Sequence, residues 1–422
     1  MECPFVPAMN AKLESPPLSI FSTIARRRAG GKAVPMRGYW AVMAILALVL
    51  GFGPARPASC VAGDASSTDS FPVRGLCIAA PSPAQVDRFA AFVRDEFAPR
   101  QGNTLILRVD YGFQFTSHPE LREGSGLSLE DIRKLVKVCR DAGVRVVPQI
   151  NLLGHQSWQR SVGKLLRTYP EFDETPWVRM PEKYAWPNPD GLYCKSYCPL
   201  HPKVHEVVFA LMDEICDAFE TDAFHAGLDE VFYLADSQCP RCAGKDRAEL
   251  FAGEVRVLRD HLALKGRKLW MWGDRLLDGK DTGLGEWEAS MNGTARAVDL
   301  IPKDVVIFDW HYDRADPTAA YFALKGLSVV TCPWKNPKTA VMQVEDNMEL
   351  RRRSTPQVRD RVLGLTQTVW SGAERFLSEY DRVSKAGGSD RTSTGEANCF
   401  LEAFDAMARM GRPADGDSKA GR

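Results

Sequence analysis

The sequence predicts a single (β/α)8 TIM barrel, an α/β fold, and three observations support this class. Eight short apolar runs recur between residues 73 and 370, and amphipathic helical runs separate most of them. The runs are almost continuously apolar, as parallel strands covered on both faces are. No glycine-rich phosphate loop follows the first run, which counts against a nucleotide-binding sheet. Eight alternating units favour a closed barrel over an open sheet.

Each expected strand is a run of β-branched, aromatic or other apolar residues. Between the second and third strands, Ser128 and Asp131 have the spacing of a capping box, and Gly143 is placed to end the helix that they begin. In chain order, the expected strands are 73–80, 103–109, 144–150, 222–228, 267–272, 304–310, 326–332 and 362–370.

The N-terminus resembles an export leader. Basic residues precede the apolar run 39–53, which is short for a membrane span, and small residues follow it. We expect cleavage between Ala58 and Ala62 and an exported protein, whether periplasmic or extracellular. Met36 is an alternative start, and Cys60 raises the alternative of a lipoprotein. An uncleaved leader would anchor the protein, and this is the only membrane contact that we expect.

The remaining chain divides into a barrel and a tail. The domain prediction is a leader over 1–70, a (β/α)8 barrel over 71–383, and a polar linker with a C-terminal helix and tail over 384–422. The 54 basic and 54 acidic side chains give zero net charge, so no global field favours nucleic acid. No motif for a dedicated protein partner is visible, and the sequence does not predict the oligomeric state.

The predicted strand ends carry polar and aromatic side chains, and in such barrels the chemistry lies in the loops that follow the strands. A single tryptophan there is ordinary packing, but four at consecutive strand ends, together with carboxylates, suit a sugar with apolar faces and hydroxyl edges. The candidates are Asp110, His155, Asp229, Glu230, Trp272, Asp274, Trp310, Trp334 and Trp370.

Four segments resemble glycoside hydrolase family 20, the β-N-acetylhexosaminidases. "FHAGLDEV" (224–231) is similar to the family's His-x-Gly-Gly-Asp-Glu motif at the fourth strand. "VRVVPQINLLGH", "LWMWGDRLL" and "QTVWSGAE" are similar to its third, fifth and eighth strand segments. The resemblance covers about residues 72–376 and implies a glycosidase with a carbohydrate substrate, an oligosaccharide or a glycoconjugate.

This resemblance implies that Glu230 is the general acid and that Asp229 orients the substrate's acetamido group. Neighbouring strand residues point to opposite sides, so the two acids should not flank a glycosidic bond as a conventional pair about 5 Å apart. The acetamido oxygen would then attack the sugar and form an oxazolinium ion, with retention and without a cofactor. Asp229 and partial burial should keep Glu230 protonated near neutral pH. His155 and His225 are expected in a supporting network, and Trp272, Trp310 and Trp370 around the acetamido group.

The chain also departs from the family pattern. Leu228 replaces the second glycine of the motif, and the first strand carries no sugar-binding arginine. The seventh strand offers no tyrosine for the acetamido oxygen. We therefore expect an altered amino-sugar substrate or lost activity. The other departures are Gln149 and Asn151 on the third strand, Gly372 for the usual glutamate with Glu374 two positions later, and an insertion-like loop whose Glu286, Trp287 and Glu288 could rebuild the sugar site.

Two pairs of cysteines stand apart from the isolated ones, which fit a core. Cys194, Cys198, Cys239 and Cys242 could together bind structural zinc or form two disulfides, and either would brace loops beside the acids. A zinc hydrolase is disfavoured because an all-cysteine site is closed. The competing interpretation is a degenerate barrel that binds carbohydrate, which the missing arginine favours and the intact Asp229–Glu230 pair opposes.

Overall fold

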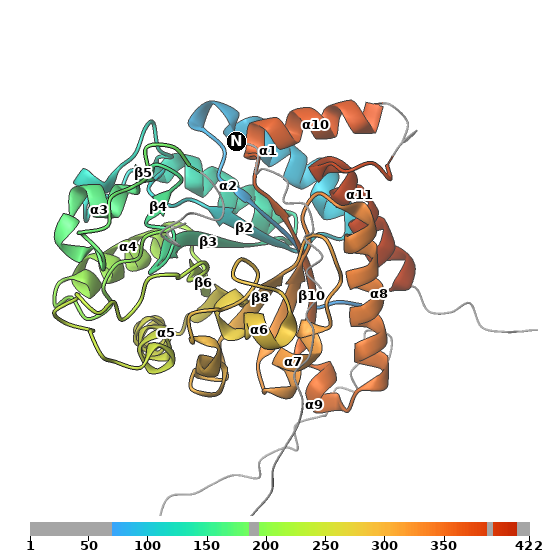
Figure 1. Ribbon diagram of the computed structural model, residues 1–422. Coiled ribbons are helices and arrows are strands. Elements are labelled where there is room, and N and C mark those ends of the chain that lie inside the picture. Colours follow the sequence, from blue (N-terminus) through green and yellow to red (C-terminus); the bar gives the residue numbers. More distant parts are fainter. Residues whose placement is uncertain (1–69, 185–193, 386–390, 412–422) are drawn as a thin grey trace, which may run out of the picture. The chain divides into compact units, whose positions relative to one another are not determined.

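The computed structural model describes residues 70–184, 194–385 and 391–411, so the expected leader lies outside the described residues. Eight parallel strands close into a barrel in the order β1-β10-β9-β8-β7-β6-β3-β2 (Figure 1), which confirms the predicted fold class. These strands are β1 (Val73–Ala79), β2 (Thr104–Arg108), β3 (Arg145–Leu152), β6 (Ala223–Gly227), β7 (Lys268–Trp272), β8 (Val306–Trp310), β9 (Ser328–Cys332) and β10 (Val362–Val369).

Helices cover the outside of the barrel (Figure 1). In the described part of the chain, none of them is long and apolar enough to span a membrane. The longer helices are α1 (Val86–Phe92), α2 (Leu129–Asp141), α4 (Val204–Ala218), α5 (Arg247–Ala263), α7 (Thr318–Leu324), α8 (Pro337–Arg353), α10 (Ala373–Lys385) and α11 (Glu396–Met410). The short elements are α3 (Lys164–Thr168), α6 (Gly279–Thr282), α9 (Pro356–Arg359) and the hairpin of β4 (Ser157–Trp158) with β5 (Ser161–Val162).

Helix α2 begins and ends where the sequence predicts. The Ser128 hydroxyl accepts a hydrogen bond from the Asp131 N–H, and the Asp131 carboxylate accepts one from the Ser128 N–H, which completes the capping box. Gly143, just beyond the helix, has a φ of 70°, a left-handed conformation that glycine adopts without steric cost.

Aromatic residues fill the inside of the barrel near the carboxyl ends of the strands. Along β7, Trp270 and Trp272 belong to the interior cluster, whereas Leu269 and Met271 pack into the layer between strands and helices. This alternation is the two-residue period of a strand. Phe308 on β8 lies 5.0 Å from the Trp270 ring, so the barrel interior below the carboxyl ends of the strands is aromatic.

The C-terminal helix packs against the barrel, as the sequence suggests. Helix α11 contacts α8, α10 and β10. Its Phe400 ring lies 5.6 Å from Phe92 and 5.9 Å from Phe376, and both pairs are buried. This packing brings the first residue of α11, Glu396, to the end of β10.

Candidate active site

Asp229 and Glu230 lie just beyond the end of β6 and point to the same place. His155 Nε2 is 3.2 Å from Asp229 Oδ2 and 2.9 Å from Glu230 Oε2. The expected strand-like alternation is therefore wrong here. β6 ends at Gly227, and left-handed φ angles of 66° at Leu228 and 49° at Glu230 turn both carboxylates toward one imidazole nitrogen.

Close contacts around this turn leave no room for a side chain at two glycines. A Cβ on Gly227, whose φ is 68°, would lie 1.8 Å from Asn151 Oδ1. A Cβ on Gly154 would lie 2.1 Å from the carbonyl oxygen of Asp229. Leu228 occupies the place where the family motif has glycine, and a left-handed residue with a Cβ costs roughly 1–2 kcal/mol. Its side chain is fully buried, so burial offsets part of that cost.

His155 is held between the acids and two other side chains. Its ring stacks on Trp158 with a centroid distance of 5.6 Å, and its Nδ1 is 3.4 Å from Cys194 Sγ. Burial opposes a charge on His155, but the neighbouring carboxylates of Asp229 and Glu230 favour it and hold the pKa of His155 well above the ordinary value. The imidazole can therefore hold a proton on Nε2, the nitrogen that faces both carboxylates.

Donors fix Glu230 from several directions. Trp287 Nε1 donates to Glu230 Oε1 at 2.7 Å, and the Cys194 thiol lies 3.4 Å from Oε2. Burial raises the pKa of Cys194 to about 12, so this thiol keeps its proton near neutral pH. The Glu230 backbone N–H donates to Asp274 Oδ2 at 2.9 Å. Asp274, expected to contact the sugar, therefore anchors the backbone of the acid.

A buried arginine connects this anchor to the loop that follows β7. Arg275 Nε donates to Asp274 Oδ2 at 2.7 Å, and its Nη2 donates to the carbonyls of Glu286, Trp287 and Ala289. Burial raises the pKa of Asp274 to about 6, against the opposing effect of Arg275. The insertion-like loop thus does reach the site, since Arg275 holds the segment that carries Trp287 to Glu230.

A second ion pair holds the same loop to β8. Glu288 Oε2 is 2.7 Å from His311 Nδ1, and Asp309 Oδ1 is 3.2 Å from His311 Nε2. Burial lowers the pKa of His311, but the two carboxylates outweigh burial and raise it to about 10. His311 is therefore a buried cation near neutral pH.

We expect the stabilising effect of His311 to depend on pH. Its pKa rises from 6.5 to about 10 on folding, so its contribution to the free energy of unfolding is complete below 6.5 and is lost as pH rises through about 10. Urea unfolding of wild type and His311→Asn should differ most near pH 6 and least near pH 10. A difference that stays constant between these two pH values would contradict the assignment.

The expected tryptophans gather around a tyrosine at the end of β8. Trp310 stacks on Tyr312 at 5.1 Å, and Trp334 meets its edge at 5.3 Å. Trp370 Nε1 donates to the Tyr312 hydroxyl at 3.0 Å. Trp334 and Trp370 are partly exposed, whereas Trp310 is buried and Trp272 fully so. Trp272 therefore supports Trp370, 6.0 Å away, from below.

The remaining expected residues lie beside the acids without touching them. His225 is fully buried 4.5 Å from the Trp272 ring, and burial lowers its pKa to about 3, so it is neutral. Asp110 Oδ1 accepts a hydrogen bond from the Asn151 N–H at 3.0 Å, and burial raises its pKa. Both residues support the loops that present Asp229 and His155.

Arg108 is a further candidate, which the strand-end motifs do not reveal because it lies on the second strand and not on the first. Arg108 ends β2 and pairs with Ala79 at the end of β1. Its guanidinium carbon lies 4.4 Å from the Trp370 ring centroid, and Nη2 donates to the Val369 carbonyl at 2.9 Å. The cross-strand register of β1 and β2 is the signal that could have identified it.

Glu396 is a second candidate that no strand-end motif reveals, because it begins helix α11. Its Oε1 accepts hydrogen bonds from Trp334 Nε1 at 2.7 Å and from the Trp370 N–H at 2.8 Å. Glu374, which follows the eighth strand in sequence, is exposed on α10 and does not take this place. The carboxylate that orients the two partly exposed tryptophans thus comes from the C-terminal helix.

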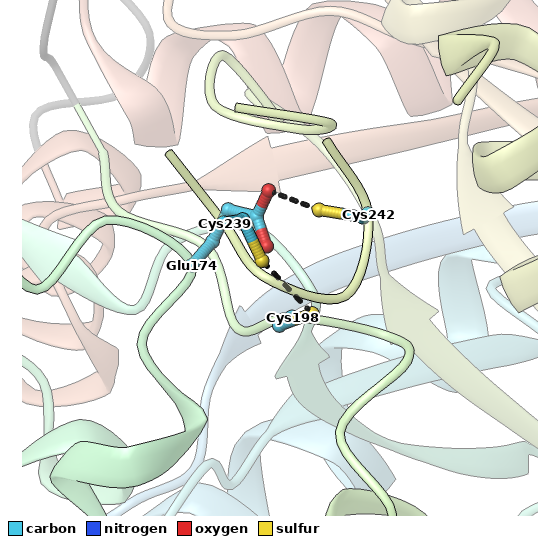
Figure 2. A group of neighbouring side chains, drawn as sticks. All are labelled: Glu174, Cys198, Cys239 and Cys242. Atoms are coloured by element: carbon cyan, nitrogen blue, oxygen red, sulfur yellow. Dashed lines mark hydrogen bonds between the residues drawn. The ribbon is translucent and has the colours of Figure 1, made fainter. Parts of the chain in front are cut away.

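The cysteines divide differently from the predicted set of four. Cys194 lies with His155 and Glu230 and apart from the other three cysteines, so the prediction that all four form one cluster is wrong. Cys198, Cys239 and Cys242 lie together with Glu174 instead (Figure 2). All nine cysteines in the described part of the chain are free thiols, so neither of the alternative disulfides is formed there.

Comparisons with known proteins identify the family to which the barrel belongs. Residues 110–376 match the model of "Glycosyl hydrolase family 20, catalytic domain". A lacto-N-biosidase from Bifidobacterium bifidum is 24% identical over 242 residues, 53% of this chain and 19% of that protein. A beta-hexosaminidase from Vibrio furnissii is 24% identical over 215 residues, 50% of this chain and 30% of that protein. The matched regions thus span less than a third of these relatives' length.

Solved structures show the same fold at low identity. A beta-N-acetylhexosaminidase superimposes with a TM-score of 0.57 at 17% identity, covering 83% of this chain and 81% of that one. An exo beta-N-acetylglucosaminidase from Vibrio harveyi, in complex with N-acetylglucosamine, gives 0.54 at 17% identity, covering 81% and 57%.

Proposed function

Because the chain belongs to glycosyl hydrolase family 20, we propose that it is a glycosidase that cleaves terminal β-linked N-acetylhexosamine, or a related amino sugar, by substrate assistance. One observation carries the proposal: Asp229 and Glu230 share a single nitrogen of His155. A sugar ring cannot enter between two carboxylates held in this way. They therefore cannot serve as an acid and a nucleophile on its opposite faces, and the substrate must supply the nucleophile.

The reaction then has two steps. The acetamido oxygen attacks the anomeric carbon, the bond to the leaving oxygen breaks, and Glu230 gives that oxygen its proton. The product of this step is an oxazolinium ion on the sugar. Glu230 next removes a proton from water, which attacks the anomeric carbon and restores the acetamido group with retained configuration.

Asp229 is placed to orient the acetamido group. Its carboxylate is buried, and Oδ1 has no hydrogen-bond partner within the described part of the chain. An unpaired buried acceptor is costly, and an acetamido N–H would satisfy it. His155 contacts Oδ2 of the same side chain, which leaves Oδ1 for the acetamido N–H while Glu230 gives up its proton and takes one back. The positive charge of the oxazolinium ion then forms beside a carboxylate.

Two residues can supply the sugar contacts that the first and seventh strands lack. Arg108 reaches over the end of β1 and has a buried Nε without a partner among the described residues. We assign it to the sugar hydroxyls. Tyr312 accepts a hydrogen bond from Trp370, which leaves its own O–H free to donate to the acetamido oxygen. These replacements support a hydrolase over a barrel that only binds carbohydrate.

Export is part of the proposal and is supported by the sequence alone. The apolar run 39–53, with basic residues before it and small residues after it, has the pattern of a signal peptide.

A panel of nitrophenyl β-glycosides tests the function. We expect release of nitrophenol from the N-acetylglucosaminide or the N-acetylgalactosaminide and none from the plain glucoside, which has no acetamido nucleophile. Hydrolysis of the glucoside at a similar rate would contradict substrate assistance. If correctly folded protein binds N-acetylhexosamine in a titration but releases no nitrophenol, the binding barrel is the better description.

A further inference from the structure

We propose that Glu174, Cys198, Cys239 and Cys242 bind one structural zinc ion. The four residues come from three separate segments of the chain and converge in the loops around β6 (Figure 2). Their side-chain ligand atoms all lie within 4.8 Å of one another, and all four residues are buried. Three thiolates and one carboxylate give the four ligands of a closed tetrahedral site.

The spacing of the sulfurs fits a shared metal ion better than a covalent bond. Cys198 Sγ and Cys239 Sγ are 3.6 Å apart. Two sulfurs of a disulfide are separated by about 2.05 Å. Two thiolates at about 2.3 Å from a tetrahedral zinc ion are roughly 3.8 Å apart. Soft thiolate ligands also favour zinc over the hard cations magnesium and calcium.

The carboxylate of Glu174 also favours a bound cation. Glu174 is fully buried, and its Oε2 has no hydrogen-bond partner within the described residues. Its Oε1 accepts from the Asp236 N–H at 3.0 Å and lies 2.6 Å from Cys242 Sγ. The nearby cation of Lys195 pairs with Asp173 instead. A buried carboxylate without a counter-charge is costly, and a divalent cation would offset that cost.

The chain between Cys239 and Cys242 is folded as a tight turn, and both thiols belong to the cluster. The Ala243 N–H donates to the Cys239 carbonyl, and the Lys245 N–H donates to the Cys242 carbonyl, each at 3.1 Å. Gly244, with a φ of 74°, ends the turn in a left-handed conformation. Two cysteines separated by two residues are a common half of a zinc site.

The site would brace the catalytic acid from both sides. Cys198 is in the same loop as Cys194, whose thiol contacts Glu230 and His155. Cys239 is in the loop that continues from Glu230. Zinc would thus fix two loops to each other directly behind the acid, without taking part in the reaction.

Metal analysis of the purified full-length protein, prepared in reducing buffer without added metal, is the first test. We expect about one zinc ion per chain, and X-ray absorption with three sulfurs at about 2.3 Å and one oxygen at about 2.0 Å. Folded wild type that stays free of metal after incubation with zinc sulfate would overturn the proposal. A Cys198–Cys239 disulfide found by mass spectrometry in protein purified without reductant would also overturn it.

Variants separate zinc binding from a purely structural role. The Cys239→Ser/Cys242→Ser double variant should lose zinc, whereas Cys216→Ser, which removes a buried thiol on α4 outside the cluster, should keep it. If the double variant does not fold, Glu174→Cys and Glu174→Ala decide. Glu174→Cys should retain about one zinc ion, because thiolate is also a zinc ligand, and Glu174→Ala should hold less. Equal zinc in all these variants would contradict the site.

Discussion

The Glu230→Gln variant should lose about 10²- to 10⁴-fold in kcat on an N-acetylhexosaminide with a poor leaving group, the range that general acid catalysis contributes. Glutamine can still accept the hydrogen bond from Trp287 and keeps the size of the side chain, but it has no acidic proton to give. The loss should be smaller for the nitrophenyl glycoside, because nitrophenolate leaves without protonation.

The dependence on the leaving group identifies the role. A residue that only shapes the site would slow both substrates by the same factor, so equal losses would contradict the assignment of Glu230 as the acid. Glu374→Gln is the matched control, since Glu374 is exposed on α10. It should leave kcat unchanged on both substrates.

The fold and the position of the acids could be predicted from the sequence for a simple reason. Buried parallel strands are short apolar runs, and the barrel places whatever follows them at one end. The run that ends at Gly227 therefore located Asp229 and Glu230. The sequence does not show that both carboxylates turn toward His155, because left-handed conformations at Leu228 and Glu230 depend on tertiary contacts with Asn151 and Gly154.

Other parts of the site come from residues distant in sequence. Glu396 belongs to a helix beyond the barrel strands, yet it orients Trp334 and Trp370. Arg108 depends on the register between β1 and β2. Cysteine spacing grouped Cys194 with the other three thiols. In the structure, Cys194 lies with Glu230, and Glu174 is the fourth member of the cluster instead. Such exchanges follow from loop conformation, which spacing alone does not determine.

The Asp229→Asn variant tests the other half of the mechanism. We expect kcat on N-acetylhexosaminides to fall by about 10²- to 10³-fold, the usual effect of removing one preorganised electrostatic contact. Asparagine keeps an oxygen that can accept the acetamido N–H, but it lacks the negative charge beside the developing oxazolinium ion. The variant also removes one of the two carboxylates that hold the pKa of His155 well above its ordinary value.

A series of N-acyl substrates links this loss to the substrate's own nucleophile. Replacing acetyl hydrogens by fluorine lowers the nucleophilicity of the acyl oxygen. If that oxygen attacks the anomeric carbon, wild-type kcat should therefore fall with each fluorine. The Asp229→Asn substitution should reduce kcat most for the N-acetyl substrate, because wild type gains most from charge stabilisation with that substrate. Asp141→Asn, at the exposed end of α2, controls for the substitution itself.

A wild-type kcat that does not change with fluorination would mean that the acetamido oxygen takes no part in the reaction. The nucleophile would then have to be water or a protein group.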